Sequence, residues 1–205
     1  MSLVSIRRLT PTLGKTAVMT QRVRAVAEVY ARHGARGRVA SVVAGDGAGQ
    51  IYLTLHFESG KRMTEIWEKT QADPAFTKVM AERERDPAGS VVGPDVYRVA
   101  FGQLDAGYPV VLMREYAIAR DKLEGALGLM PDLAALMKAH DVGLVAATPV
   151  FSGDMSQLIA AYYCRSPAHL GSAIDGVGAS AEFRSIVTRA AAFGTLARSR
   201  VLVNI

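Results

Sequence analysis

The chain carries one structural plan twice, at a constant spacing of 107 residues. Residues 50–84 read as a strand, a corner and a helix whose apolar residues recur at helical spacing. The same order returns from residue 157 onward. A shift of 107 pairs Gln50 with Gln157, Ser59 with Ser166, Phe76 with Phe183, Arg7 with Arg114, and His33 with His140. The repeated order and its ungapped spacing predict a chain built by duplication.

Each half is predicted to follow the order β-α-β-β-α-β. The expected strands are 4–9, 38–44, 51–58 and 96–102 in the first half, and 110–118, 142–151, 158–164 and 198–203 in the second. A helix should run from Thr12 to about Gly34, and its counterpart over 121–140 should be split by Pro131. The two units are expected to span residues 1–105 and 108–205.

This order of elements predicts a four-stranded antiparallel sheet with both helices on one face. The other face of each sheet is too apolar to meet water, so it must pack against a partner. Two such sheets packed face to face make an eight-stranded barrel. The sequence leaves open whether that barrel closes within one chain or between chains. Because an intrachain barrel could leave free strand edges, we expect a homodimer.

Composition excludes several classes of protein. The net charge is +5, but the basic residues are scattered, which argues against a nucleic-acid partner. No apolar run reaches the roughly 18 residues that cross a bilayer, so no membrane association is expected. The single cysteine, Cys164, lies in an apolar strand and is expected to be a buried, inert thiol. These features predict a cytoplasmic protein.

At this point the sequence resembles the dimeric α/β-barrel superfamily, in a tandem form with two ferredoxin-like repeats in one chain. The helix with Trp67 that leads into Ala72-Asp73-Pro74-Ala75-Phe76 is similar to NIPSNAP-like and antibiotic-biosynthesis-monooxygenase-like domains. In heme-degrading relatives a histidine ligand follows this turn, whereas residues 76–83 and 183–190 contain none. The resemblance therefore implies no heme at that position, and neither a cofactor nor a metal site is expected.

Strand alternation selects the residues expected to line the barrel. On the third strand Tyr52, Thr54, His56 and Glu58 should face inward. Arginines pair with anionic groups, and His56 is the candidate general base. The complete set of predicted site residues is His56 as catalytic group, with Arg7, Tyr52, Glu58, Arg98, Arg114, Tyr116, Tyr163 and Arg165 as ligand-binding groups.

Three functions are compatible with this pattern. The first is the binding of a small aromatic or anionic molecule in the barrel cavity. The second is a cofactor-independent monooxygenase-like or isomerase-like enzyme, and the third is a non-catalytic oligomeric scaffold. An open polar cavity of roughly 300 Å³ or more would favour the first two, and a barrel filled by Tyr52, Tyr116 and Tyr163 would favour the third. The polar residues could also pair with one another, for instance Arg165 with Glu58.

Overall fold

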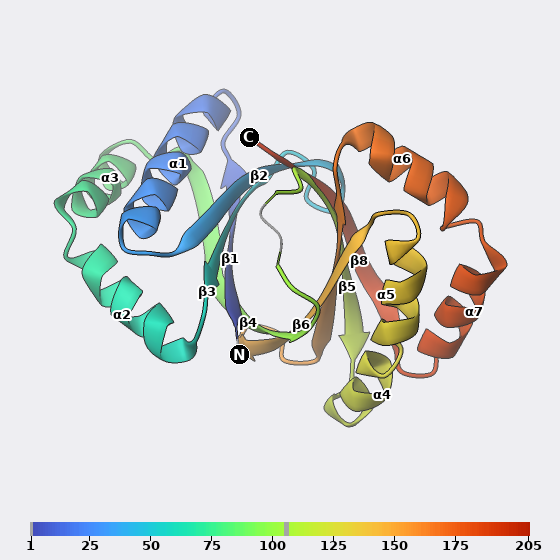
Figure 1. The fold of residues 1–205 in the computed structure, drawn as a ribbon. Helices are drawn as coiled ribbons and strands as arrows, with labels where there is room; N and C mark the ends of the chain where they lie inside the picture. The colour runs from blue at the N-terminus through green and yellow to red at the C-terminus, as the bar shows by residue number, and fades with distance from the viewer. Residues whose placement is uncertain (1, 105–106) are drawn as a thin grey trace.

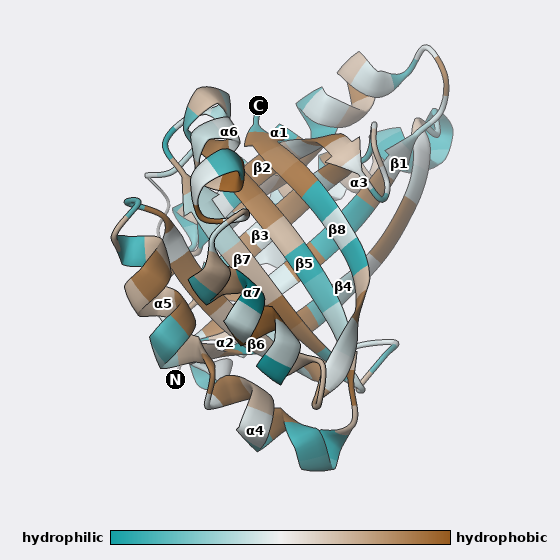
Figure 2. Ribbon diagram, turned by 90° about the vertical axis from the view of Figure 1, so that its right-hand side faces the viewer, coloured by the Kyte–Doolittle hydropathy of each residue, from teal (hydrophilic) through white to brown (hydrophobic). Residues whose placement is uncertain are grey.

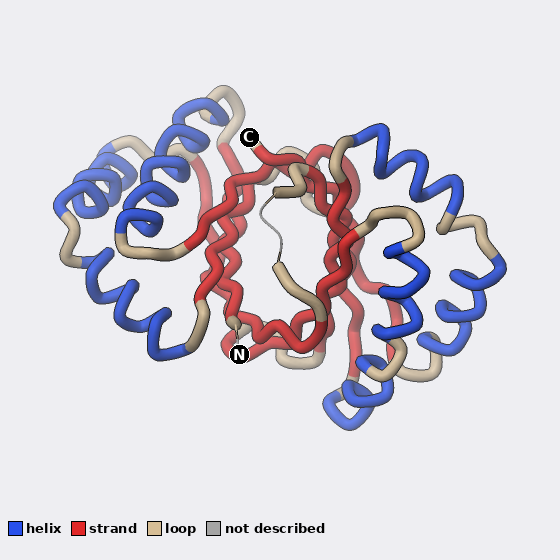
Figure 3. The backbone as a smooth tube through the Cα atoms, viewed as in Figure 1, coloured by secondary structure: helices blue, strands red, loops and turns tan. Residues whose placement is uncertain are grey.

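A computed structural model describes residues 2–104 and 107–205. In this part of the chain eight strands form a closed antiparallel barrel in the order β1-β3-β2-β8-β5-β7-β6-β4. Helices cover the barrel on two opposite sides, and the strands between them are seen along the barrel axis (Figures 1 and 3). The fold is α+β with antiparallel strands, as predicted. The domain boundary expected at residue 105 lies outside the described residues.

The two halves have the same order of elements. The first half consists of β1 (Leu3–Pro11), α1 (Thr16–Arg32), β2 (Arg36–Gly45), β3 (Ile51–Phe57), α2 (Gly60–Gln71), α3 (Pro74–Arg85) and β4 (Gly89–Phe101). The second consists of β5 (Val110–Ile118), the 3-10 turn η1 (Arg120–Lys122), α4 (Leu123–Leu127), α5 (Met130–Lys138), β6 (Gly143–Phe151), β7 (Gln157–Cys164), α6 (Pro167–Gly176), α7 (Ala181–Ala190) and β8 (Gly194–Asn204).

Local sequence explains where several of these helices begin. Ser59 and Ser166 are extended residues whose hydroxyl groups accept hydrogen bonds from the backbone N–H three residues later, before α2 and α6. Asp73 caps α3 in a similar way, with Pro74 in its first turn. The helix expected over 121–140 is indeed divided, into η1, α4 and α5, with Pro131 in the first turn of α5.

The barrel closes within one chain. Strand β2 pairs with β8, and β4 pairs with β6, so each half is joined to the other along both edges. The strand β4 begins earlier than expected, because Gly89 to Val92 already pair with the end of β1. No strand edge of the barrel is left free in the described residues. The free edges from which we expected a homodimer are therefore absent there.

Three separate cores fill the molecule. One lies between the first sheet and α1, α2 and α3, and includes Tyr30, Leu55 and Ile66. A second lies between the second sheet and the helices α4 to α7. The third occupies the barrel interior, where the two sheets face each other. Hydrophobic residues predominate on most of the barrel wall, with hydrophilic segments on β5 and β8 (Figure 2).

Cys164 and Trp67 support this description of the cores. Cys164 is fully buried in the second core, and burial raises the pKa of its thiol, as expected for an inert residue. Trp67 packs against the first core from the helix α2.

Candidate functional site

The barrel interior is packed rather than hollow. Tyr52 and Tyr163 do face inward as predicted, and together with Tyr97 they belong to the apolar interior core. In the described residues the cavity left there measures about 60 Å³, and Arg38, Thr54 and His56 line it together with tyrosine and aliphatic side chains. Pockets for small molecules usually measure roughly 300–1,000 Å³. The expectation of a ligand cavity inside the barrel is therefore wrong, because aromatic and aliphatic side chains from both sheets fill that space.

His56 borders this small cavity near one end of the barrel. Burial, followed by the positive charges of Arg38 and Arg36, lowers the pKa of His56 to about 4. The imidazole is therefore neutral at pH 7. A base with so low a pKa accepts a proton only weakly near neutral pH, so this environment does not favour the role of general base that we predicted.

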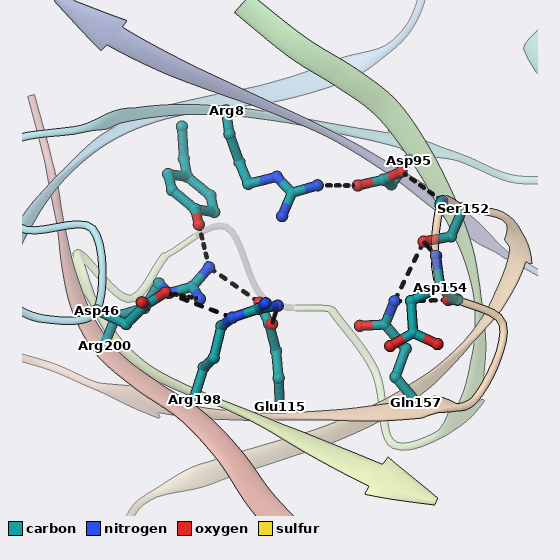
Figure 4. Close-up of polar contacts among 11 residues, drawn as sticks. Arg8, Asp46, Asp95, Glu115, Ser152, Asp154, Gln157, Arg198 and Arg200 are labelled. Atoms are coloured by element: carbon teal, nitrogen blue, oxygen red, sulfur yellow. Dashed lines mark hydrogen bonds and ion pairs between the residues drawn. The ribbon is translucent and has the colours of Figure 1, made fainter. Parts of the chain in front are cut away.

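A network of charged side chains fills the other end of the barrel (Figure 4). Arg200, which is only 2% exposed, donates to the Tyr52 hydroxyl, lies 2.9 Å from Glu115 Oε1 and lies 2.6 Å from Asp46 Oδ2. Arg198 binds the second oxygen of Glu115 at 3.2 Å. Burial raises the pKa of Tyr52 to about 12. The network joins Asp46 and Tyr52 of the first half to Glu115, Arg198 and Arg200 of the second, and Arg200 Nε is buried without a hydrogen-bond partner.

Three of the predicted residues lie at barrel ends or on the surface. Glu58 follows β3 and, together with His56, lines a pocket of about 170 Å³ at the barrel rim, and Arg98 is exposed on β4. Arg165 pairs with Asp141, at 2.9 Å between Nε and Oδ2, and not with Glu58. In the described residues, Glu58 is thus brought beside His56 at the rim, whereas neither Arg98 nor Arg165 lines a pocket with His56.

Arg7, Arg114 and Tyr116 lie on the side of the sheets that faces the helices. Their predicted location in the barrel is wrong for a simple reason of alternation. On β1 the inward positions are held by Val4 and Ile6, so Arg7 lies on the opposite face. Arg114 and Tyr116 have the same relation to Val111 and Met113 on β5.

The largest of the described cavities on this side lies in the second half and measures about 300 Å³. The sheet strands β5, β7 and β8 form its floor, and α4, α5 and α7 form its walls. Its lining consists of Arg114, Tyr116, Ile118, Ala126, Leu129, Met130, Leu133, Leu158, Ala160, Tyr162, Phe183, Ile186, Val187, Ala190, Ala191, Gly194, Thr195 and Leu196. We call it the second-half pocket.

Among the residues that the structure describes, Arg114 is the one charged residue in this lining. Its guanidinium carbon lies 5.6 Å from the centre of the Tyr162 ring and 6.0 Å from that of Phe183. Its Nε atom is buried and has no hydrogen-bond partner. Burial raises the pKa of Tyr162, so its hydroxyl group stays protonated beside Arg114. Arg114 also hydrogen-bonds the Tyr162 hydroxyl, so its Nε is the donor left without a partner beside a mostly apolar lining.

The first half contains an equivalent cavity of about 260 Å³, which we call the first-half pocket. Eleven of its lining residues match the second-half pocket after a shift of 107: Arg7, Leu9, Met19, Arg22, Val23, Val26, Leu53, Phe76, Val79, Met80 and Arg83 correspond to Arg114, Tyr116, Ala126, Leu129, Met130, Leu133, Ala160, Phe183, Ile186, Val187 and Ala190. Nη2 of Arg7 donates to the Tyr30 hydroxyl at 3.1 Å, and Nη1 is buried without a partner.

Sequence reasoning missed Tyr162, Phe183, Arg22 and Arg83 as pocket residues. The alignment at 107 residues already paired Arg7 with Arg114 and Phe76 with Phe183. Arg7 and Phe76 line the first-half pocket, and Arg114 and Phe183 line the second-half pocket. Those matches were the available signal. What they did not reveal was the face of the sheet on which the cavities lie.

Two further properties concern metals and membranes. Among residues 2–104 and 107–205, no three histidine, cysteine or acidic side chains are grouped so that they could hold a metal ion. Within the same residues, no helix combines the length and hydrophobicity needed to cross a bilayer.

No protein-family model and no curated protein matches this sequence. Solved structures do resemble it. A provisionally assigned monooxygenase from Fusobacterium nucleatum has a TM-score of 0.69 at 6% identity, over 99% of this chain and 94% of the other. An anthrone oxidase-like protein has a TM-score of 0.66 at 13% identity, over 100% and 91%. A heme-binding protein from Thermus thermophilus has a TM-score of 0.54 at 13% identity, over 100% and 90%.

These likenesses span nearly the whole chain at very low sequence identity. They therefore establish the fold and not the activity. The chain has the α+β-barrel fold that is also found in monooxygenase-like proteins.

Proposed function

We propose that the protein binds a small apolar molecule with one anionic group, such as an aromatic carboxylate, in the second-half pocket. The observation that carries this proposal is the guanidinium of Arg114, whose Nε atom is buried without a partner in an otherwise uncharged lining. A buried donor without a partner lowers stability, and an anionic ligand would supply the missing acceptor.

The remaining lining matches an apolar ligand body. The aromatic rings of Tyr162 and Phe183 lie beside the guanidinium, and Leu133 and Ile186 extend the apolar wall. Aromatic rings favour stacked or edge-to-face contacts with another ring. A cavity of about 300 Å³ lies at the lower end of the range for small-molecule sites, so the ligand should be small.

The enzymatic alternative is a cofactor-independent monooxygenase-like or isomerase-like reaction. The fold of the provisionally assigned monooxygenase and the anthrone oxidase-like protein supports this class. The role of His56 as its base receives little support, because His56 borders a cavity of only about 60 Å³ and has a pKa of about 4. If the protein is an enzyme, its substrate is better placed beside Arg114. The packed barrel interior supports a structural role for that part of the molecule.

Heme is a cofactor that one protein with this fold binds. The second-half pocket is a poor match for it. Heme iron is usually held by histidine, cysteine, methionine or tyrosine side chains. None of the four histidines lines either large pocket in the described residues, and the raised pKa of Tyr162 disfavours its ionised, ligating form. Met130 remains as a weak candidate ligand, and we derive no reaction step through heme.

The wider organisation is part of the same proposal. We infer that the two units arose by duplication, which the shared order of elements and the equivalent pockets support. The narrower resemblance to NIPSNAP-like domains, a cytoplasmic location and a homodimer stay predictions. Sedimentation or light scattering of the full chain would test the homodimer.

The ligand proposal is tested by calorimetric titration with 1-naphthoate and with the uncharged 1-naphthalenemethanol. We expect 1-naphthoate to bind at least about tenfold more tightly, because a charge-assisted hydrogen bond to arginine contributes about 1.5–3 kcal/mol. Arg114→Met should remove this preference while keeping the apolar volume. Arg24→Met, which removes an exposed arginine on α1, is the matched control and should bind as the parent does. Equal affinity for both probes in the parent protein would refute the proposal.

A further inference from the structure

The two equivalent pockets differ most clearly in charge. The first-half pocket is lined by three arginines: Arg7, Arg22 and Arg83. In the second-half pocket the positions of Arg22 and Arg83 are held by Leu129 and Ala190, so Arg114 alone remains. No acidic residue is present in the described lining of either pocket. One scaffold therefore surrounds two cavities of similar size with unequal positive charge.

The three arginines have donors available toward a ligand. Arg7 Nη1 is buried and has no hydrogen-bond partner. Arg22 uses Nη1 and Nη2 on the backbone oxygen and carboxylate of Asp86, at 2.6 and 3.4 Å, which leaves its Nε donor. Arg83 is exposed in the last turn of α3, on the wall of the pocket.

The rest of the first-half pocket is apolar. Val23, Val26 and Phe76 line it together with Met19, Val79 and Met80. Arginine side chains bind phosphate oxygens with paired, directed hydrogen bonds, and a phosphate monoester carries up to two negative charges at neutral pH. A lining with three guanidinium groups and an apolar wall therefore matches such an ester better than it matches a carboxylate.

We propose that the first-half pocket is a second binding site, which takes a phosphate monoester of a small apolar or aromatic alcohol. The phosphate contacts Arg7, Arg22 and Arg83, and the apolar group contacts Phe76 and the aliphatic wall. This site is independent of the one proposed for the second half, because the two pockets share no lining residue and the helices that wall them cover opposite sides of the barrel (Figure 1).

The methionines provide a separate reporter for each pocket. Met19 and Met80 line the first-half pocket, and Met130 lines the second-half pocket. The full chain is labelled with ¹³C at the methionine methyl groups and titrated with 1-naphthyl phosphate, 1-naphthoate and inorganic phosphate. The affinity of each probe is read from the shifts of the Met19 and Met80 signals. We expect 1-naphthyl phosphate to bind at least about tenfold more tightly than either other probe.

Arg83→Ala is the first variant, because this exposed side chain can be removed without disturbing the core. It should weaken the binding of 1-naphthyl phosphate at Met19 and Met80 by about tenfold, and Arg7→Met should weaken it at least as much. Arg24 lies on the same helix as Arg22 but outside the pocket. Arg24→Met is therefore the control and should change the affinity less than twofold.

Three results would overturn the proposal: no shift of Met19 or Met80, equal affinity for 1-naphthoate there, or unchanged affinity in both Arg83→Ala and Arg7→Met. If inorganic phosphate bound as tightly as 1-naphthyl phosphate, the proposed contribution of the apolar group to binding would be refuted. The response of Met130 to 1-naphthoate reports on the other pocket. Failure of the second-half proposal is therefore distinguishable from failure of this one.

Discussion

The two halves share their architecture more closely than their chemistry. Phe76 and Phe183 occupy equivalent places in the two pockets, as do Arg7 and Arg114 on the first strand of each half. The difference in charge lies at wall positions, where Arg83 of the first-half pocket corresponds to Ala190 of the second-half pocket. Strand alternation and helix packing thus fix where a pocket forms. A few wall residues then decide which charge it accepts.

The last strands of the halves show a second contrast. Arg98 on β4 and Arg200 on β8 lie in the last strands of the two halves, yet Arg98 is exposed and Arg200 is 2% exposed inside the barrel. The strand pairings explain the difference. Arg200 lies opposite Met113 as Asp95 lies opposite Ile6, so the counterpart of Arg200 in the first half is Asp95 and not Arg98. Arg200 contacts Glu115 and Asp46 inside the barrel, whereas Arg98 lies three residues further along its strand.

The largest predicted effect sharpens this contrast between Arg98 and Arg200. Arg200→Met should lower the free energy of unfolding by about 3–5 kcal/mol, because it leaves Glu115 buried with a weaker set of partners. Arg98→Met should change the free energy of unfolding by less than about 0.5 kcal/mol, as surface substitutions do. Urea unfolding at pH 7 measures both variants.

A double variant keeps this prediction open to refutation. Arg200→Met combined with Glu115→Leu removes both buried charges and should recover part of the lost stability. A similar loss in Arg98→Met and Arg200→Met would show that the two arginines are equivalent after all.

The next effect concerns His56, whose counterpart in the second half is Tyr163. Native His56 has a pKa of about 4, whereas an unfolded histidine has a pKa of about 6.5. Between these values the unfolded chain binds more protons, so the free energy of unfolding should rise with pH and level off above about 6.5. At acidic pH the low pKa of His56 lowers the free energy of unfolding by up to about 3 kcal/mol.

His56→Gln should flatten this part of the pH profile, measured by urea unfolding at several pH values between 4 and 7.5. His140→Gln removes an exposed histidine and serves as the matched control. An unchanged slope in His56→Gln would mean that the imidazole is not held neutral by the barrel.

The smallest effect compares two helix caps that the repeat places in equivalent positions. The Ser59 hydroxyl accepts from Arg62 N at 3.1 Å, and the Ser166 hydroxyl accepts from His169 N at 3.0 Å. Ser59→Ala and Ser166→Ala should each cost about 1 kcal/mol of unfolding free energy. Thermal unfolding of the two variants should give matching losses, and a clear difference would break the equivalence of the halves at this position.

Much of the fold could be predicted from the sequence, because it depends on local signals. The strand 110–118 and the division of 121–140 follow from hydrophobic pattern and from Pro131. The start of β4 was missed, because Gly89 to Val92 read as a turn-rich loop and join the sheet only through pairing with β1. Closure within one chain also depends on pairing between distant strands, which no local pattern contains.

The candidate site was harder to predict. The shift of 107 residues matched Arg7 with Arg114, and each lines a pocket. Alternation alone, however, does not say which face of a strand meets the helices and which meets the other sheet. Val4 and Ile6 take the inward positions and leave Arg7 under the helices. The low pKa of His56 likewise arises from its burial beside Arg38 and Arg36, which are distant in sequence.

The central claim is that a small molecule binds between a sheet and its helices, not inside the barrel. Methionine methyl spectra test it directly, since Met130 lines the second-half pocket and Met113 borders the small barrel cavity. On titration with 1-naphthoate, the account predicts a saturable shift of the Met130 signal with Met113 unchanged. A saturable shift of Met113 without any change at Met130 would contradict it.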